Sequence, residues 1–344
     1  MRAMAYDIIT LGEALIDLPA IEAGVSLCDA QTFTKVPAGA PANVAVAATK
    51  LGLSAAFISK VGDDPFGESI IHAFASCGVD VSHIIKDKAA RTGLAFVSVM
   101  PDGSRDFLFY FDPARDLALR PDELDEAALA SARILHYGSI SLIAEPSRSA
   151  TREAARLAHS GGAFCSYDPN LRPWLWPSEE AMRRGALLGF ADADIVKISE
   201  EEVQFLMPDA ANESAAVDAL FGAGPQIRLL CVTRGANGST GYVRQGSEIA
   251  TGVHSPGFSV NFVDATGAGD AFVAGLLTFL IRQQADLSKT LGNLAPLLQK
   301  ALRYANACGA LATTTLGATP HTLTDEAVQA LLASHADEWL KTTR

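Results

Sequence analysis

The segment Val263–Phe272 reads Val-Asp-Ala-Thr-Gly-Ala-Gly-Asp-Ala-Phe and continues into the apolar run Ala271–Leu277. Gly267 and Gly269 allow a tight turn that a ligand can approach closely. The apolar run predicts a buried helix, whose first N–H groups have no partner within the helix and whose positive dipole end faces the turn. The segment therefore predicts a binding site for an anion such as phosphate.

Asp270 lies at the mouth of this predicted site. Amides that hold an anion, next to a carboxylate that takes a proton from a hydroxyl, are the groups that phosphoryl transfer requires. An alternative interpretation is that Asp270 only caps the helix, because aspartate is favoured at helix N-termini.

The composition is that of a globular protein with 344 residues, of which 49% are hydrophobic and 19% charged. This length suffices for one large α/β domain or two smaller ones. The formal net charge of −12 disfavours nucleic acid or an anionic membrane as the main partner. It does not exclude a nucleotide, which local backbone amides can bind.

The five cysteines form no Cys-x-x-Cys pair and the seven histidines show no metal-ligand spacing. The sequence therefore predicts neither a zinc site nor a disulfide framework. Met1–Leu11 lacks the pattern of a signal peptide, and the longest apolar run, Ala271–Ile281, is too short to span a bilayer. We expect a cytoplasmic protein.

From about Asp122 onward, helical patterns alternate with short apolar strands. This alternation predicts a mostly parallel sheet covered by helices on both faces. The predicted helices are 123–131, 147–159, 178–190, 200–206, 213–221 and 291–313, and the predicted strands are 134–137, 163–167, 195–198 and 227–232.

Polar clusters follow three of these strands, at Asp168–Arg172, Ser199–Glu202 and Thr233–Gly238. Ligands of parallel sheets bind beyond the carboxyl ends of the strands, so we expect the three clusters to share one edge. Asx turns and a solvated first helical turn are the alternative explanations of the same residues.

The N-terminal part predicts a strand at 8–11 and a helix at 44–51. The alternation over 14–18 predicts an edge strand with one solvent-facing side. Two further strands, 92–100 and 104–111, are separated by a Pro-Asp-Gly turn. Together these strands predict a small sheet that projects from the main body.

Three strings resemble the PfkB (ribokinase-like) family of sugar kinases. The string 264–272 resembles the family's C-terminal signature, and Pro37–Ala45 is similar to its N-terminal motif. The string Asp168–Trp176 resembles the corresponding segment of the fructokinases in this family. Motifs occur in the family's order over nearly the whole chain, and no P-loop string is present.

The resemblance implies an α/β fold of the ribokinase-like αβα type, with a mostly parallel central sheet and a small β-sheet lid. Residues 1–344 would form a single kinase domain, and the lid would come from segments of about 12–38 and 92–116. The implied reaction is ATP-dependent phosphorylation of a sugar hydroxyl, with D-fructose as the substrate that the strings favour. Asp270 would be the general base, and the amides of Gly267, Ala268, Gly269 and Asp270 would form the anion hole.

The resemblance also implies ligands for sugar, nucleotide and cations. The residues implied for the sugar are Asp17, Gly39, Asn43, Arg115, Arg172 and Asp270. The residues implied for ATP are Asn170, Thr233, Gly235, Gly238, Gly267, Gly269 and Asn306. Glu202 would hold Mg²⁺ through water, and the carbonyls of Asp264 and Thr266 would border a site for a monovalent cation such as K⁺.

Several of these residues have alternative explanations. Without the resemblance, Asp17 is a strand-end residue and Asn43 a helix-start residue. Asn306 lies among small residues that also suit helix packing. Arg115 is either a solvated loop charge or a contact to the substrate.

The sequence departs from the family at three positions. Ala38 stands where the family has a glycine, and it would cost about 1 kcal/mol if that position required positive φ. Ser199 replaces an asparagine, and Ala114–Arg115 replaces a Ser-Ala pair of the fructokinases.

The alternatives to fructose are 2-keto-3-deoxygluconate or another sugar or nucleoside. A regulator that binds sugar or nucleotide without turnover is a further alternative. A dehydrogenase is disfavoured, because no Gly-x-Gly-x-x-Gly string follows the first strand. The resemblance also suggests a homodimer formed through the lid.

Overall fold

The computed structural model describes residues 5–22, 24–100, 105–245, 248–249, 252–283, 294, 297–317 and 322–336. The side chains of Arg105, Arg115 and Gln245 lie outside this description, so the predicted role of Arg115 has no structural counterpart here.

A large, mostly parallel sheet forms the centre of the described part, in the order β13-β12-β11-β10-β9-β8-β1-β4-β5, with β14 paired to β12. The strands from β11 through β5 run parallel, whereas β12, β13 and β14 pair in antiparallel fashion at one edge. Their bounds are β1 Tyr6–Leu11, β4 Ala55–Gly62, β5 Ile84–Asp87, β8 Ala132–Gly138, β9 Phe164–Asp168, β10 Ile195–Ser199, β11 Leu229–Thr233, β12 Ser239–Gln245, β13 Glu248–Ile249 and β14 Val253–Ser255.

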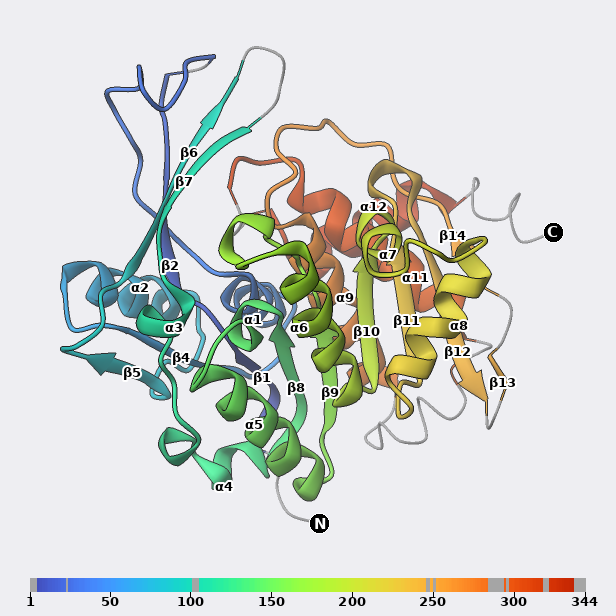
Figure 1. The fold of residues 1–344 in the computed structure, drawn as a ribbon. Helices are drawn as coiled ribbons and strands as arrows, with labels where there is room; N and C mark the ends of the chain where they lie inside the picture. Colours follow the sequence, from blue (N-terminus) through green and yellow to red (C-terminus); the bar gives the residue numbers. More distant parts are fainter. Residues whose placement is uncertain are drawn as a thin grey trace.

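Helices cover both faces of this sheet, because successive strand residues point to opposite sides and both sides are apolar. Ile8 and Ile9 of β1 are both 0% exposed, yet they belong to two different hydrophobic cores. Figure 1 shows α5, α6 and α8 on the near side of the sheet and α9 and α11 on the far side. The fold class predicted from the sequence is therefore confirmed.

The two cores assign the longer helices to the two faces. The core on one face contains side chains of α1 Ala40–Lys50, α2 Pro65–Ser76, α9 Ala268–Gln283, α11 Leu298–Ala312 and α12 Asp325–Ser334. The core on the other face contains side chains of α4 Glu126–Leu129, α5 Ser147–Gly161, α6 Glu179–Ala191, α7 Glu200–Leu206 and α8 Glu213–Ala223. The short helices are α3 Pro113–Asp116, η1 Pro121–Glu123, η2 Ile140–Leu142, η3 Pro173–Leu175 and η4 Gly235–Asn237.

A second sheet of four strands, in the order β3-β2-β6-β7, projects from the main body at the upper left of Figure 1. Its strands are β2 Leu15–Pro19, β3 Val36–Ala38, β6 Gly93–Val99 and β7 Arg105–Tyr110. All four lie inside the two segments from which the sequence predicts a lid. That this sheet acts as a lid stays a prediction.

The edge strand predicted in this region needs correction, and the structure answers the condition stated for Ala38. β2 is not an edge strand, because β3 and β6 flank it on its two sides. Ala38 ends β3 and pairs with Leu15. Among the described residues other than glycine, Asn170 has positive φ and Ala38 does not. The alanine at position 38 therefore carries no backbone strain.

The helix predicted at 123–131 is also wrong. The chain instead forms η1 and, after Leu124, the separate helix α4. The side chain of Asp125 accepts a hydrogen bond from Ala128 N at 3.0 Å and so starts a new helix. At the other end of the chain, the helix predicted at 291–313 is α11, while 291–293, 295 and 296 lie outside the described residues.

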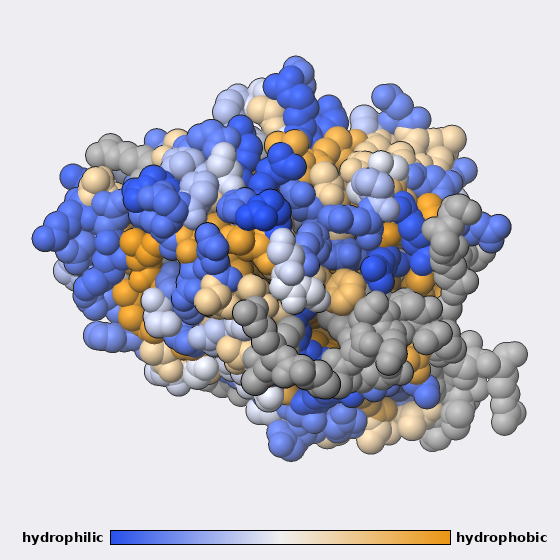
Figure 2. All heavy atoms as spheres, turned by 90° about the horizontal axis from the view of Figure 1, so that it is seen from below, coloured by the Kyte–Doolittle hydropathy of each residue, from blue (hydrophilic) through white to orange (hydrophobic). Residues whose placement is uncertain are grey.

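Hydrophilic side chains predominate on the face at the amino ends of the parallel strands, and hydrophobic ones show between them (Figure 2). No helix in the described ranges combines the length and apolar character needed to cross a bilayer.

Candidate active site

A pocket lies where the parallel strands β8 and β9 end. Gly138 and Asp168, the last residues of these strands, are register partners, and so are Ser199 and Thr233 at the ends of β10 and β11. The three polar clusters predicted to share one edge therefore do so. The pocket is lined by Glu13, Ala40, Pro41, His136, Gly138, Ser139, Ile140, Asp168, Asn170 and Asp270.

Asp270 and Asn43 meet in this pocket, although they lie 227 positions apart in the sequence. Asn43, in the first turn of α1, donates a hydrogen bond from Nδ2 to Asp270 Oδ2 at 2.8 Å. Both side chains are buried, with 6% and 9% of their surfaces exposed. The Oδ1 atom of Asn43 is buried and has no hydrogen-bond partner within the described part of the chain. Asn43 thus orients the carboxylate and leaves an acceptor for a ligand.

The surroundings of Asp270 make its carboxylate a stronger base. Burial is the largest cause and raises the pKa of Asp270 to about 6. The hydrogen bond from Asn43 and the charges of Lys197 and Arg172 lower the pKa, whereas the charge of Asp168 raises it. A carboxylate with a pKa near neutrality is largely ionised at pH 7 and still accepts a proton readily.

The turn before α9, for which the sequence predicts an anion site, contains a glycine in a left-handed backbone conformation. Gly267 has a φ of 76°, which disfavours residues other than glycine, and α9 begins at Ala268. The carboxylate of Asp264 stabilises the turn by accepting from Thr266 N at 3.0 Å, Thr266 Oγ1 at 2.8 Å and Gly317 N at 3.0 Å. The first amides of a 16-residue helix therefore face the turn that the glycine forms.

Lys197 places a buried positive charge beside this turn. A Cβ atom on Gly269 would lie 3.0 Å from Lys197 Nζ, so the ammonium group lies next to the glycine backbone. Lys197 Nζ donates to Asp168 Oδ2 at 2.9 Å, and both residues are buried. Burial lowers the pKa of Lys197, but the charges of Asp168, Glu202 and Asp270 and the hydrogen bond to Asp168 together outweigh it, so the net shift is upward and the lysine stays charged.

Glu202 lies at the same edge, but its carboxylate is already hydrogen-bonded. Its Oε1 accepts from Leu171 N at 2.7 Å and its Oε2 from Ser199 N at 2.9 Å. Ser199 Oγ in turn accepts from Glu202 N at 3.2 Å, which completes a capping box. Burial, followed by the charge of Asp168, raises the pKa of Glu202.

The remaining residues predicted for the sugar lie around the pocket and on the small sheet. Gly39 has a φ of 141°, and a Cβ there would lie 2.2 Å from the carbonyl oxygen of Glu13. The chain itself therefore requires glycine at this position. Arg172 lies close enough to lower the pKa of Asp270. Asp17, half-buried on β2, has Ala95 and Val36 as its register partners.

The residues predicted for ATP lie along the ends of β9, β11 and β12. Gly235 has a φ of 52° and no heavy atom within 4 Å of a Cβ, so its backbone is open to a ligand. A Cβ on Gly238 would instead lie 2.1 Å from the Ser255 carbonyl oxygen. Thr233 ends β11, and Asn170 adopts a φ of 42° beside the pocket.

Asn306 is held by the protein itself. Its Nδ2 donates to the carbonyls of Ser255 at 3.0 Å and Pro256 at 3.2 Å, and its Oδ1 accepts from Ser239 Oγ at 2.9 Å. It therefore joins α11 to β12 and to the end of β14.

Sequence reasoning missed two functional candidates, Lys197 and Glu13. Lys197 interrupts the apolar strand Ile195–Ile198, and a charge inside a buried strand was the available signal. Glu13 follows β1 and its terminal turn at the carboxyl edge, which is where ligands of parallel sheets bind.

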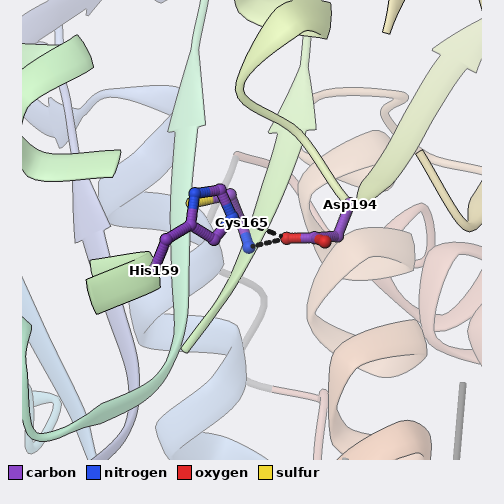
Figure 3. A group of neighbouring side chains, drawn as sticks. All are labelled: His159, Cys165 and Asp194. Atoms are coloured by element: carbon purple, nitrogen blue, oxygen red, sulfur yellow. Dashed lines mark hydrogen bonds and ion pairs between the residues drawn. The ribbon is translucent and has the colours of Figure 1, made fainter. Parts of the chain in front are cut away.

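A second group of potential ligand side chains lies at the opposite end of the sheet (Figure 3). His159, Cys165 and Asp194 come from α5, β9 and the segment before β10. Asp194 Oδ2 lies 2.8 Å from His159 Nε2 and accepts from Cys165 N at 2.9 Å. Burial raises the pKa of the Cys165 thiol well above its usual value. The group is best explained as a structural ion pair.

The comparisons with known proteins show the family of the chain. The pfkB family carbohydrate kinase model matches residues 5–325. The chain is 44% identical to a probable fructokinase-2 of Arabidopsis thaliana over 318 residues, which cover 92% of this chain and 93% of the relative. It is also 44% identical to fructokinase-2 of Oryza sativa subsp. japonica over 332 residues, covering 96% and 95%.

Two solved structures are similar over the same extent. A fructokinase of Xylella fastidiosa with bound ATP has a TM-score of 0.85 and 35% identity, covering 96% of this chain and 99% of that one. A fructokinase of Vibrio cholerae O395 bound to fructose, ADP and calcium has a TM-score of 0.78 and 34% identity, covering 95% and 99%. The glycine turn, the buried aspartate and these similarities lead to one conclusion: the chain belongs to the pfkB family of carbohydrate kinases.

Proposed function

We propose that this protein transfers the γ-phosphoryl group of ATP to a hydroxyl of fructose. The observation that carries the proposal is the position of Asp270, which is buried at the N-terminus of α9 and oriented by Asn43 at 2.8 Å. A sugar hydroxyl in the pocket would meet this carboxylate, while a phosphate would meet the amides of the turn. Relatives named as fructokinases support fructose as the acceptor.

Asp270 acts as the general base. As the phosphoryl group moves to the sugar oxygen, the hydroxyl proton passes to the carboxylate of Asp270. Asn43 Nδ2 holds one oxygen of this carboxylate, so the other oxygen is directed to the acceptor hydroxyl. The Oδ1 atom of Asn43 accepts from a further sugar hydroxyl, which would satisfy a buried polar atom.

The amides of Gly267, Ala268, Gly269 and Asp270 stabilise the charge on the transferring group. Lys197 adds a fixed positive charge beside Gly269, and Asp168 holds this charge in place at 2.9 Å. Preorganised donors of this kind act at low dielectric, where they stabilise developing charge more than in water.

Asp17, Gly39 and Arg172 complete the proposed sugar site. Asp17, which lies on β2 of the small sheet, accepts hydrogen bonds from sugar hydroxyls. Gly39 fixes the turn that starts α1. Arg172 lies close enough to Asp270 for its positive charge to act on the carboxylate. Its guanidinium group would bind either the sugar or the transferring phosphate. Arg115 remains a proposed sugar contact on the basis of the sequence.

The nucleotide lies along the strand ends from β9 to β12 in this proposal. Thr233, Gly235 and Gly238 border its phosphates or ribose, and Asn170 lies near the transferring group. Asn306, whose amide is bonded to Ser255, Pro256 and Ser239, acts by positioning the adjacent loop.

Glu202 fits a role as a magnesium ligand through water, because its oxygens already accept two backbone hydrogen bonds. A magnesium ion held there would neutralise charge on the ATP phosphates. The carbonyls of Asp264 and Thr266 are the proposed border of a potassium site, and the bonds of the Asp264 side chain to Thr266 and Gly317 keep that loop in place.

A coupled assay of ADP release with a panel of sugars tests the substrate. Fructose should give a higher kcat/KM than 2-keto-3-deoxygluconate, because Asp17, Asp168 and Asp270 would repel a sugar carboxylate. A preference for the acid of about tenfold or more, which corresponds to about 1.4 kcal/mol, would overturn the choice of fructose. Arg115→Ala would then show whether Arg115 binds the acid.

Asp270→Asn separates an enzyme from a protein that only binds sugar or nucleotide. The amide keeps the shape of the side chain but removes its basicity, so kcat should fall about 10²- to 10⁴-fold. Sugar and ATP affinities, measured by calorimetry, should change much less. If the variant keeps more than about a tenth of the wild-type kcat, Asp270 is not the general base.

Two further properties belong to the proposal. A homodimer through the lid would cover the outer face of the small sheet, where Leu108 and Tyr110 are 47% and 64% exposed. Sedimentation velocity measures this directly, and Tyr110→Lys should shift a dimer toward monomer. The cytoplasmic location stays a prediction of the sequence.

A further inference from the structure

Glu13 is a buried carboxylate for which the mechanism above has no use. It follows β1 and Gly12, is 3% exposed, and lines the same pocket as Asp270. Its backbone carbonyl packs against Gly39, where a Cβ would lie 2.2 Å from the carbonyl oxygen. Glu13 therefore lies in contact with the turn that begins α1.

One oxygen of the Glu13 carboxylate has a structural role. Oε1 accepts a hydrogen bond from Ala40 N at 3.0 Å. Ala40 is the first residue of α1, and its N-cap Gly39 has no side chain to cap the helix. Glu13 thus satisfies one of the backbone N–H groups at the start of α1 that have no partner within the helix.

The second carboxylate oxygen of Glu13, Oε2, has no structural role of this kind. Oε2 is buried and has no hydrogen-bond partner in the described ranges of the chain, as is also the case for Asn43 Oδ1 in the same region. A buried acceptor without a donor is destabilising, and native proteins rarely keep one unless a ligand or water satisfies it. The two acceptors, Asn43 Oδ1 in the first turn of α1 and Glu13 Oε2 next to that turn, suit a ligand with several hydroxyl groups.

The charges around Glu13 agree with this assignment. Burial raises the pKa of Glu13 to about 7, although hydrogen bonds from the backbone of Glu13 itself and of Ala40 lower it; the charge of Arg172 also lowers it and that of Asp270 raises it. Asp168 and His136 also line the pocket. Burial lowers the pKa of His136 to about 3, so this imidazole is neutral. Above pH 7 Glu13 is ionised, and a hydroxyl donor would stabilise its charged form.

We propose that Glu13 binds the sugar: Oε2 accepts a hydrogen bond from a hydroxyl other than the one that Asp270 deprotonates, while Ala40 N–H holds Oε1. This inference rests on the proposed sugar-kinase function. It makes Glu13 a residue that sets which hydroxyl pattern the pocket recognises.

Glu13→Gln at pH 8 tests the assignment, because glutamine can keep the bond from Ala40 but presents an NH₂ donor instead of the second acceptor. Fructose affinity by calorimetry should weaken about 10- to 100-fold, as expected for a lost hydrogen bond to a charged group. The KM for ATP should stay within about twofold and kcat should fall less than the KM for fructose rises, because the contact binds substrate before and during transfer. The melting temperature should stay close to wild type.

Asp125→Asn is the matched control, because Asp125 also caps a helix, by accepting from Ala128 N at 3.0 Å on α4. It should leave sugar affinity unchanged. A set of fructose analogues that each lack one hydroxyl then locates the contact. The loss of affinity caused by Glu13→Gln should disappear for the analogue that lacks the contacted hydroxyl and persist for the others.

Unchanged fructose affinity in Glu13→Gln, or an equal penalty with every analogue, would overturn the assignment and leave Glu13 as a helix cap. Different results would count against the proposed kinase function. If the wild-type protein binds sugar but releases no ADP, the kinase proposal fails while calorimetry still decides the role of Glu13. If it binds no sugar at all, both proposals fail.

Discussion

The buried charged side chains at the pocket have fixed partners, one of them charged and the other a neutral amide. Lys197 is paired with Asp168 at 2.9 Å, and Asp270 is hydrogen-bonded to Asn43 at 2.8 Å. Removing one member of a buried pair leaves the other uncompensated, which typically costs about 3–5 kcal/mol. Effects of mutation at Asp168 or Lys197 on activity must therefore be separated from effects on folding.

The His159–Asp194 pair offers a test of electrostatics away from the pocket (Figure 3). The hydrogen bond to Asp194 raises the pKa of His159 above its ordinary value, although burial opposes this. Since the folded-state pKa is the higher one, the stabilisation is complete below the unfolded pKa of about 6.5 and is lost as the pH rises through the folded pKa.

His159→Gln should therefore destabilise the protein more at pH 5.5 than at pH 8.5, by up to about 1 kcal/mol because the pair is partly exposed. Urea unfolding at the two pH values measures the difference. An equal or larger effect at pH 8.5 would mean that the pair does not stabilise the charged imidazole.

At the level of elements, the position of α9 depends on its close contact with α11. A Cβ on Gly275 of α9 would lie 2.6 Å from Cys308 Sγ and 3.2 Å from the Cα of Ala305. Glycine thus allows the two helices to approach each other closely. Because Asp270 is on the same helix, this packing also bears on the position of its carboxylate, the proposed general base.

Gly275→Ala should destabilise the protein by about 1–3 kcal/mol, because the added methyl overpacks the interface with α11. Gly222→Ala in α8 is the matched control. No heavy atom lies within 4 Å of a Cβ at Gly222. That substitution should stabilise by about 0.5–1 kcal/mol through helix propensity alone. Thermal and urea unfolding compare the two variants, and similar effects in both would contradict the packing argument.

At the scale of the whole molecule, an aromatic stack joins the small sheet to the main body. Trp174 of η3 lies with its ring centroid 5.1 Å from that of Phe107 and 5.8 Å from that of Phe109, both on β7. Asp17, Ala95 and Phe109 are successive register partners across β2, β6 and β7, so their side chains share one face. The stack therefore holds the face that carries Asp17 against the segment that follows Asp168.

Trp174→Ala should raise the KM for sugar about 5- to 30-fold, since each aromatic pair contributes about 0.5–1.5 kcal/mol. The KM for ATP should change little, because the nucleotide residues lie on the main body. Trp174 is 51% exposed, so global stability should fall only slightly. Steady-state kinetics with Trp174→Phe as control, which keeps a ring, checks this. An unchanged sugar KM in the alanine variant would show that the lid needs no such contact.

Local patterns in the sequence were sufficient to predict most elements. The helix 200–206 has the predicted bounds, because Ser199 and Glu202 form a capping box within one turn. The glycine turn before α9 was predictable for the same reason, since Gly267 needs its positive φ wherever the segment lies. The alternation of helices and strands likewise determined the parallel sheet and the edge at which Asp168, Ser199 and Thr233 meet.

Only the tertiary structure decided which side chains meet in the pocket. Asn43 and Asp270 come from opposite ends of the chain, and Glu13 reaches Ala40 across a gap of 27 residues. The approach of Lys197 to Gly269 and of Trp174 to β7 depends likewise on how α9 and the small sheet pack. Hydrophobic periodicity and helix caps depend on residues a few positions apart. The contacts in the pocket instead arise when helices pack on both faces of one sheet, and no local pattern in the sequence specifies which side chains this packing brings together.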